Sequence, residues 1–332
     1  MALSAFDYRI GVRIHREQPP ESILPYAQTV EDLGFDDVWV VEDLPFAGGL
    51  TAASAVLAAT GRITVGVGVL ASVVRNPAYL AMEIATLERM FPGRTVAGIG
   101  HGVQSWMDTV GARAASPLTA LQETLSSLGE LLHGQRVSAD GRYVRLHDVA
   151  LAFPPATPPP VLAGVRGPKS LSVAGTACDG VLLAEPATPA YLAWARALVE
   201  AAAARAGRPR PQMAVYTWLS IDRDSTAARE RLTPVLAENL GDPAARVHLT
   251  GLPFAAELTS RLDDPRRRAA GVPLLEPEWL GDLAVAGSPG DCAAAVRALA
   301  RAGADRVILL PLPGDERAQI EQFARQVRPL LP

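Results

Sequence analysis

The chain has 332 residues, of which 49% are hydrophobic and 20% charged, so it can bury a large core and is not intrinsically disordered. Its 31 Lys and Arg residues against 35 Asp and Glu residues give a net charge of −4. The sequence has no basic run apart from Arg266-Arg267-Arg268. We therefore expect no nucleic-acid partner.

Neither the cysteines nor the first residues indicate a metal site or export. Cys178 and Cys292 lie far apart, without Cys-x-x-Cys spacing or a nearby histidine pair. We expect small buried side chains there, with no bound metal and no disulfide. Residues 1–9 lack an apolar region, and no run approaches about 18 apolar residues. We expect a cytoplasmic protein without a membrane partner.

The first half of the sequence predicts four consecutive strand–helix units. Strands are expected over residues 8–14, 37–42, 63–70 and 94–101, and helices over residues 21–33, 50–60, 77–91 and 118–133. Apolar runs predict the strands, and apolar residues at helical spacing predict the helices. Gly34 and Pro92-Gly93 end helices, and Pro77 fits the first helical turn, where a missing N–H costs nothing.

The second half continues the alternation with two interruptions. Residues 135–160 change to an alternating pattern around the turn Asp140-Gly141, which predicts a β-ribbon. Strands are then expected over residues 160–164, 179–184, 213–221 and 305–311, and helices over 168–177, 189–206, 225–240, 289–303 and 316–330. Residues 241–283 show no clear period and are interpreted as an insertion.

Eight strand–helix alternations in one run favour a closed (β/α)8 TIM barrel over a doubly wound sheet. No G-x-G-x-x-G fingerprint stands between the first strand and the first helix, which weakens the dinucleotide-binding alternative. We therefore predict a single α/β domain over residues 1–332. The insertion at residues 241–283 would form a lid near the barrel mouth.

The third predicted strand is the first candidate for a ligand site. Gly66 and Gly68 lie toward its C-terminal end, a pattern typical of a buried strand that backbone or ligand approaches closely. Ala71 and Ser72 then form a short loop of small residues before Arg75-Asn76-Pro77. Since TIM barrels bind ligands at the C-terminal ends of their strands, we expect a binding site here.

Other strand ends supply further candidates. They are Glu42 and Asp43 after the second strand, Gly100, His101 and Gly102 after the fourth, Gly164, Val165, Arg166 and Gly167 after the fifth, and Ala184 and Glu185 after the sixth. The turn from Gly164 to Ser170 opens a helix, and it could bind a phosphate or be only a tight Gly-Pro turn. His101 could face a ligand or pack internally, and Glu42-Asp43 could handle protons or cap a helix. Hydrolase, metalloprotease and P-loop motifs are absent.

Several motifs occur here as a set: residues 63–70 (ITVGVGVL) with Arg75-Asn76-Pro77, residues 85–88 with Gly93-Arg94 and residues 98–102 (GIGHG), and Gly164 to Lys169 with Asp179-Gly180. From about residue 8 to residue 330 the chain resembles the bacterial luciferase-like superfamily. Within it, the chain is most similar to deazaflavin-dependent reductases of the methylenetetrahydromethanopterin reductase type. The resemblance implies a homodimeric TIM barrel that binds coenzyme F420, or alternatively FMN.

The resemblance also implies roles for individual residues. The cofactor ring would rest on a bulge at Gly68, Val69 and Leu70, with a non-proline cis peptide bond between Gly68 and Val69. Glu42 and Asp43 would lie near the ring, Gly100 to Gly102 beside the cofactor's side chain, and Gly164 to Gly167 at its phosphate. Ala71, Ser72, Ala184 and Glu185 are further cofactor-binding candidates.

The resemblance further implies an enzyme in which the deazaflavin C5 transfers a hydride to an electron-poor C=C or C=N bond of a small metabolite or a modified-peptide intermediate. Glu42, Asp43 and His101 are the candidate proton donors, with water as a competitor. The Asp-His pair and the Glu of the related sugar-phosphate dehydrogenases are missing, because Glu42-Asp43 and Val103 occupy those positions. The alternatives are an FMN-dependent monooxygenase and a barrel subunit that has lost catalysis.

Overall fold

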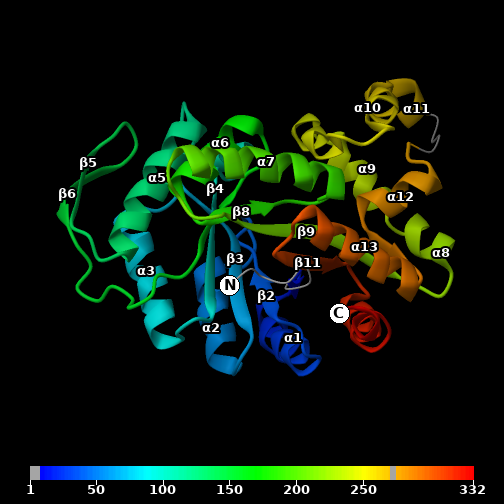
Figure 1. The fold of residues 1–332 in the computed structure, drawn as a ribbon, viewed down its shortest axis with the longest axis horizontal. Helices are drawn as coiled ribbons and strands as arrows, with labels where there is room; N and C mark the ends of the chain where they lie inside the picture. Colours follow the sequence, from blue (N-terminus) through cyan, green and yellow to red (C-terminus); the bar gives the residue numbers. More distant parts are fainter. Residues whose placement is uncertain (1–7, 270–273) are drawn as a thin grey trace. The chain divides into compact units, whose positions relative to one another are not determined.

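Strands and helices alternate along the chain (Figure 1). The structure, a computed structural model, describes residues 8–269 and 274–332. Its first part contains β1 (Arg9–Arg13), α1 (Pro20–Asp32), β2 (Asp37–Val40), α2 (Gly49–Ala59), β3 (Thr64–Ala71), α3 (Pro77–Met90), β4 (Thr95–Gly100), α4 (Gln104–Thr109) and α5 (Pro117–Leu132). These elements follow the predicted boundaries to within a few residues, except α4, which lies in a passage predicted to be irregular.

The middle of the chain contains the predicted ribbon and two further strand–helix units. Its elements are β5 (Val137–Asp140), β6 (Arg145–Val149), β7 (Val161–Gly164), α6 (Pro168–Ala177), β8 (Gly180–Leu183), α7 (Pro189–Arg205) and β9 (Gln212–Ile221). β5 and β6 pair in antiparallel fashion, so the ribbon prediction is confirmed. Thr188 caps α7, because its hydroxyl oxygen accepts a hydrogen bond from the Tyr191 N–H at 3.1 Å.

The last part of the chain is richer in helices than the sequence pattern predicts. It contains α8 (Ser225–Glu230), α9 (Thr233–Gly241), the 3-10 helix η1 (Pro243–Leu249), α10 (Ala255–Asp263), α11 (Pro265–Ala269), α12 (Pro277–Leu283), β10 (Val285–Gly287), α13 (Pro289–Ala302), β11 (Arg306–Pro311) and α14 (Glu316–Gln322), which continues as a π-helical turn (Phe323–Val327) and a 3-10 turn (Arg328–Leu330).

The strands form one parallel sheet in the order β10-β9-β11-β1-β2-β3-β4-β7-β8, and β9 also pairs with β8. The eight strands predicted from the sequence are therefore those of a closed parallel barrel, and β10 is an additional strand paired with β9. The predicted (β/α)8 TIM-barrel class is confirmed. None of the described helices has the length and apolar character needed to cross a membrane.

The chain divides into two compact units, which we describe separately. The N-terminal unit comprises residues 13–182 and 198–212, and the C-terminal unit comprises residues 1–12, 183–197 and 213–332. Every strand end from β2 to β7 that carries a predicted site residue lies in the N-terminal unit. Ala184 and Glu185 lie in the C-terminal unit.

Packing explains one of the glycines of β3. The Trp39 side chain of β2 is fully buried in the N-terminal unit. A Cβ atom on Gly66, its partner in the parallel register, would lie only 2.3 Å from the Trp39 indole ring. Any larger residue would therefore displace one of the largest side chains of this core. Gly66 is required by the barrel interior.

The ribbon is attached to α5 of the same unit through one carboxylate. Glu123 accepts hydrogen bonds from the backbone N–H groups of Arg142, Tyr143 and Val144, at 3.0, 2.8 and 3.0 Å. These bonds lower the pKa of Glu123, whereas its burial opposes them by raising it. The carboxylate thus satisfies three amides of the ribbon turn that lack strand partners.

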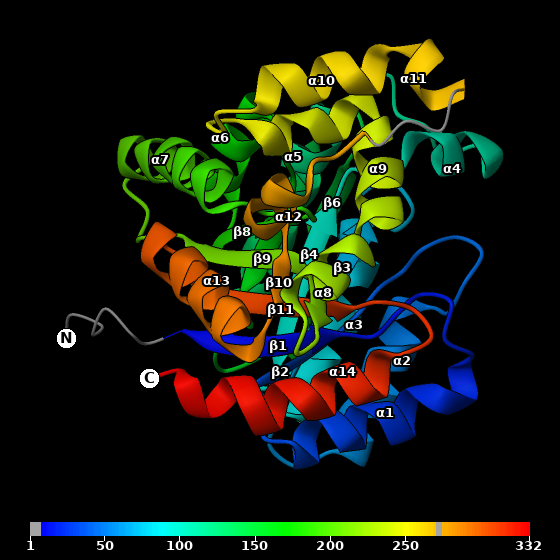
Figure 2. The ribbon, with the colours of Figure 1, turned by 90° about the vertical axis from the view of Figure 1, so that its right-hand side faces the viewer.

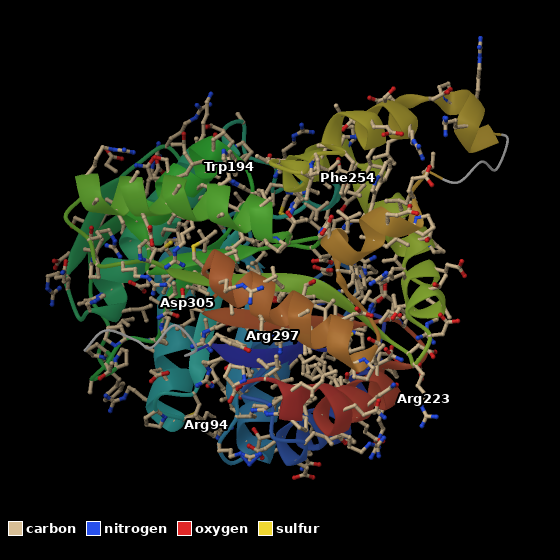
Figure 3. All side chains as sticks on the ribbon, turned by 45° about the vertical axis from the view of Figure 1, so that its right-hand side comes forward. Arg94, Trp194, Arg223, Phe254, Arg297 and Asp305 are labelled. Carbon is tan, nitrogen blue, oxygen red and sulfur yellow. The ribbon has the colours of Figure 1, made fainter. Side chains whose placement is uncertain are left out.

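In the C-terminal unit, β11 lies between β1 and β9, with Val307 opposite both Ile10 and Val215 (Figure 2). Asp305, labelled in Figure 3, precedes β11 and accepts a hydrogen bond from the Met213 N–H at 2.8 Å. This side chain joins the beginnings of β9 and β11. The short loop before β11 is therefore fixed at both of the strands that it serves.

One prediction for this unit needs correction. The helix predicted over residues 225–240 is broken, because Pro234 lies in the first turn of a new helix and cannot supply the N–H that a continuous helix needs. Where residues 241–283 are described, they form short helices with a small core. In that core Phe254 (Figure 3) stacks on Trp279, with their ring centres 4.9 Å apart. The guanidinium carbon of Arg261 lies 4.7 Å from the centre of the Trp279 ring.

Candidate functional site

β3 is irregular at the point where the sequence predicts a bulge. The parallel register between β3 and β4 shifts between Val67 and Leu70. The peptide bond between Gly68 and Val69 is cis, so this prediction is confirmed. Val69 and Ala71 remain partly exposed, while Leu70 is buried. The bulge therefore presents alternate side chains of β3 at the end of the strand.

The side chain of Val69 is seated among glycines of the neighbouring strands. A Cβ atom on Gly164 of β7 would lie 2.3 Å from Val69 Cγ1, and one on Gly100 of β4 would lie 2.7 Å from Val69 Cγ2. A Cβ atom on Gly98 would meet the Val67 carbonyl oxygen at 2.5 Å and Val69 Cγ1 at 3.2 Å. These three glycines make room for the bulge. We refer to Gly98, Gly100 and Gly164 as the glycine cradle.

The small residues next to the bulge have different surroundings. Ser72 is 4% exposed, and among the described residues its hydroxyl group has no hydrogen-bond partner. Its backbone is fixed, since the Ser72 N–H donates to the Gly100 carbonyl and its own carbonyl accepts from Thr124. Gly102 has a φ of +73°, in the left-handed region that favours glycine. A polar atom buried without a partner marks a place where a ligand or a water could bind.

Glu42 is held in an ion pair. Arg75, at the beginning of α3, donates two hydrogen bonds to the Glu42 carboxylate, at 2.5 and 2.8 Å. The same carboxylate accepts the Gly49 N–H at 3.1 Å, in the first turn of α2. Of the two alternatives that the sequence leaves open for Glu42, this hydrogen bond corresponds to the capping of a helix, and the side chain remains partly exposed. The bidentate pair fixes the position of the carboxylate.

Asp43 belongs to a second charged group that the sequence analysis did not identify. Arg16, in the loop after β1, lies 3.4 Å from Asp43 and also donates to Glu17 at 2.8 Å. The Arg16 guanidinium lies 5.4 Å from the Phe46 ring centre. His15 is nearly buried, and its Nδ1 lies 2.5 Å from Glu17. The charged residues directly after the first strand are the sequence feature from which this group could have been predicted.

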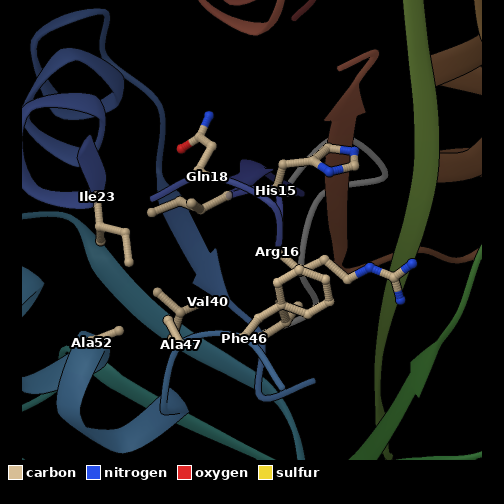
Figure 4. A pocket seen from close by; sticks show the side chains of 10 residues that line it. His15, Arg16, Gln18, Ile23, Val40, Phe46, Ala47 and Ala52 are labelled. Carbon is tan, nitrogen blue, oxygen red and sulfur yellow. The ribbon is translucent and has the colours of Figure 1, made fainter. Parts of the chain in front are cut away.

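His15, Arg16 and Phe46 of this group border a small cavity (Figure 4). Its volume is about 20 Å³, which is enough for one water molecule. The wall is mainly apolar, with polar groups at one side; it consists of Ile14, His15, Arg16, Gln18, Ile23, Val40, Val41, Phe46, Ala47 and Ala52. The ends of β1 and β2 therefore enclose a narrow apolar recess beneath an ion pair.

His101 lies between two other elements of the N-terminal unit. Its Nδ1 is 3.2 Å from the Pro117 carbonyl oxygen at the beginning of α5, and its Nε2 is 3.0 Å from the Ser170 hydroxyl in the first turn of α6. Burial lowers the pKa of His101, the Pro117 carbonyl raises it, and the charge of Arg166 lowers it further. Both ring nitrogens are thus engaged within the protein.

The turn between β7 and α6 has the features of an anion site. Gly167 precedes α6 and has no side chain that could cap the first amides of this helix. Arg166 is partly exposed and Lys169 is exposed, so two cations accompany the free amides. Val165 is buried and serves packing. Backbone N–H groups and positive side chains at a helix N-terminus are suited to a phosphate.

The remaining site candidates and the potential metal ligands are described next. Ala184 and Glu185 follow β8 in the C-terminal unit, and Glu185 precedes a cis proline. Among residues 8–269 and 274–332, no cluster of three or more His, Cys, Asp or Glu side chains could hold a metal ion. Cys178 and Cys292 are free and buried, and burial raises the pKa of each to about 12. Neither thiol can react readily near neutral pH.

Comparison with known proteins adds to this geometry. The model of the luciferase-like monooxygenase family matches residues 3–306. The chain is 27% identical to a 5,10-methylenetetrahydromethanopterin reductase of Methanolobus tindarius, over 96% of this chain and 98% of that protein. It is 28% identical to an F420-dependent glucose-6-phosphate dehydrogenase of Intrasporangium calvum, over 97% of this chain and 98% of that protein.

Solved structures show the same fold. The structure of the coenzyme F420-dependent tetrahydromethanopterin reductase of Methanopyrus kandleri superimposes with a TM-score of 0.82 at 24% identity. The match covers 98% of this chain and 100% of that chain. At this identity the likeness concerns the fold, and the roles of individual side chains must be argued from this chain.

Proposed function

This chain belongs to the luciferase-like monooxygenase family, and on that premise we propose that it is an oxidoreductase that uses coenzyme F420. The proposal is supported by similarity along nearly the whole chain to two kinds of enzyme, of which one is named F420-dependent and the other a methylenetetrahydromethanopterin reductase. The observation that carries it is the bulge in β3, with Val69 fixed in the glycine cradle. The bulge provides a rigid surface for a flat ring.

The residues of the N-terminal unit fit such a cofactor. Gly68, Val69 and Leu70, with Ala71 and Ser72, would support the ring, and the buried Ser72 hydroxyl would find there the partner that it lacks among the described residues. Gly100, His101 and Gly102 would lie along the polyol side chain. Gly164 to Gly167 and the uncapped N-terminus of α6 would bind the phosphate. Ala184 and Glu185 remain further candidates.

The reduced deazaflavin would supply a hydride from its C5, and the protein would orient it and exclude water. We propose that the acceptor is an electron-poor C=C or C=N bond of a small molecule, such as a metabolite or a modified-peptide intermediate. Of the three candidate proton donors, Asp43 lies 3.4 Å from Arg16. Glu42 is held by Arg75, and His101 by Pro117 and Ser170.

Titration with oxidised F420 and with FMN tests this proposal. We expect F420 binding, seen as a change in deazaflavin absorbance or fluorescence, and slow reaction of the bound reduced cofactor with oxygen. Tight FMN binding with oxygen consumption would contradict the proposal and indicate a monooxygenase. Failure to bind either cofactor would indicate a barrel that serves as a non-catalytic subunit.

We also propose that the protein is a homodimer that associates through α3. Three large apolar side chains on this helix are exposed, Tyr79 by 67%, Met82 by 49% and Met90 by 60%. They recur at helical spacing and form one stripe, which a two-fold axis would place against itself. The Met82→Glu variant should be a monomer by light scattering, whereas Ser260→Glu on α10 should keep the wild-type mass. An unchanged mass of Met82→Glu would exclude this interface.

A further inference from the structure

The hydrogen bonds of His101 determine which of its nitrogens carries the proton. A carbonyl oxygen can only accept, so His101 Nδ1 must donate to Pro117 across the 3.2 Å contact. Burial lowers the pKa of the ring, which favours the neutral form near pH 7. In neutral imidazole the other nitrogen has a lone pair. His101 Nε2 is therefore the acceptor in its 3.0 Å contact with Ser170.

This arrangement in turn fixes the hydroxyl group of Ser170. Its hydrogen is directed to His101, and among the described residues His101 is the partner of this hydroxyl. The two lone pairs of Ser170 Oγ are left to accept hydrogen bonds. The side chain is partly exposed in the first turn of α6, beside Lys169 and close in sequence to Arg166. A ligand that reached it would have to offer a donor.

We propose that Ser170 is a ligand-binding residue that accepts a hydrogen bond from a hydroxyl of the cofactor's polyol chain, and that His101 is its positioning residue. This inference rests on the proposed function, since F420 and FMN both carry such a chain. A phosphate that lacks hydrogens cannot supply the donor, so the phosphate is left to the uncapped amides before Ser170. His101 then acts through Ser170 and delivers no proton to the acceptor.

The proposal has a consequence for pH. When His101 is protonated, its Nε2 becomes a donor, and Ser170 must turn its own hydrogen toward the ligand. A polyol hydroxyl can both donate and accept, so its hydrogen bond to Ser170 should reverse its direction as the pH drops through the lowered pKa of His101.

Binding of F420 to two matched variants tests the pair. Ser170→Ala should weaken the wild-type affinity about 5- to 10-fold, as expected for the loss of one hydrogen bond. Ser172→Ala, two residues along the same helix, should bind F420 like the wild type. Equal affinities of Ser170→Ala and the wild type would overturn the proposal.

A double-mutant cycle separates positioning from direct contact. In His101→Asn the amide can still donate to Pro117, but no acceptor reaches Ser170. Because His101 acts through Ser170, this change should weaken F420 binding in the wild type and have no further effect in Ser170→Ala. Additive effects would contradict the positioning role.

The tautomer can be measured without any cofactor. Nitrogen-15 spectra of labelled histidine, with His101 assigned from the His101→Asn variant, should show a protonated Nδ1 and an accepting Nε2 at pH 7.5. A protonated Nε2 would overturn the inference even where F420 binds. If the wild type bound neither F420 nor FMN, the proposed function and this inference would both fall, whereas normal binding with an unaffected Ser170→Ala variant would remove this inference alone.

Discussion

The loops after β1 and β2 differ from the ends of β3, β4 and β7 in what holds them. At the first, charged side chains meet: Glu42 pairs with Arg75, and Arg16 lies between Asp43 and Glu17. At the second, a single valine is seated among glycines, with one neutral His–Ser pair nearby. One region is shaped by electrostatics and can respond to pH and salt. The other is shaped by close packing, which cannot accommodate even a small change in side-chain volume without strain.

The largest effect should come from filling the glycine cradle. Gly164→Ala places a Cβ atom 2.3 Å from Val69 Cγ1, and we expect a loss of about 2–3 kcal/mol in the free energy of unfolding together with weaker F420 binding. Urea unfolding and F420 titration measure the two effects. The double variant Val69→Ala/Gly164→Ala should recover part of the stability. If the stability did not recover, the contact with Val69 would not be the reason why position 164 requires glycine.

A smaller loss should follow from breaking the ion pair of Glu42. Arg75→Met keeps most of the side-chain volume but leaves the partly buried carboxylate with only the hydrogen bond from the Gly49 N–H among its described contacts. We expect the free energy of unfolding to fall by about 1–2 kcal/mol at pH 7. Urea unfolding measures this loss, and an unchanged free energy of unfolding would show that the ion pair does not stabilise the fold.

The His–Ser pair should add a pH dependence to the packed region. Because the folded state holds the pKa of His101 below its ordinary value of 6.5, the unfolded chain binds the proton more readily. The stabilisation is therefore complete above pH 6.5 and is lost as the pH falls through the lowered pKa. Over this range the unfolding free energy of His101→Asn should fall less steeply than that of the wild type. Parallel curves would show that His101 does not titrate differently in the folded state.

The smallest effect is expected for the exposed charges. Arg16 is about as exposed as its partner Glu17, at 40% and 48%, and exposed pairs contribute little. Arg16→Ala should change the free energy of unfolding by less than about 0.5 kcal/mol. If Asp43 donates the proton, however, the same variant should shift the pH profile of turnover. A stability loss as large as that of Arg75→Met would show that the ion pairs of Arg16 stabilise the fold as much as the pair between Glu42 and Arg75.

The barrel could be predicted because Gly and Pro mark its boundaries. Gly34, Pro77 and Pro92 separate regular apolar segments, and the observed elements begin and end close to them. Residues 241–283 could not be assigned, because short helices around Phe254 and Trp279 bury too few residues to produce a long periodic pattern. β10 was missed for the same reason, since it has only three residues.

The site was predictable where residues adjacent in sequence act together. The bulge at Gly68 and Val69 belongs to this class, because the family resemblance carries it on a continuous motif. The partner of His101 was not predictable, since Ser170 lies 69 positions away and serine is common in the first turn of a helix. Gly100 and Gly164 were interpreted as ligand contacts, and only the folded strands show that Val69 also requires them.

The seating of Val69 also limits how such a protein can change over generations. A larger residue at Gly100 or Gly164 collides with Val69. No single substitution among these positions leads to an intermediate without a clash unless the side chain at position 69 shrinks first. A lineage that remodels this surface for another cofactor must therefore take its steps in a fixed order, and a design effort would have to alter β3, β4 and β7 together.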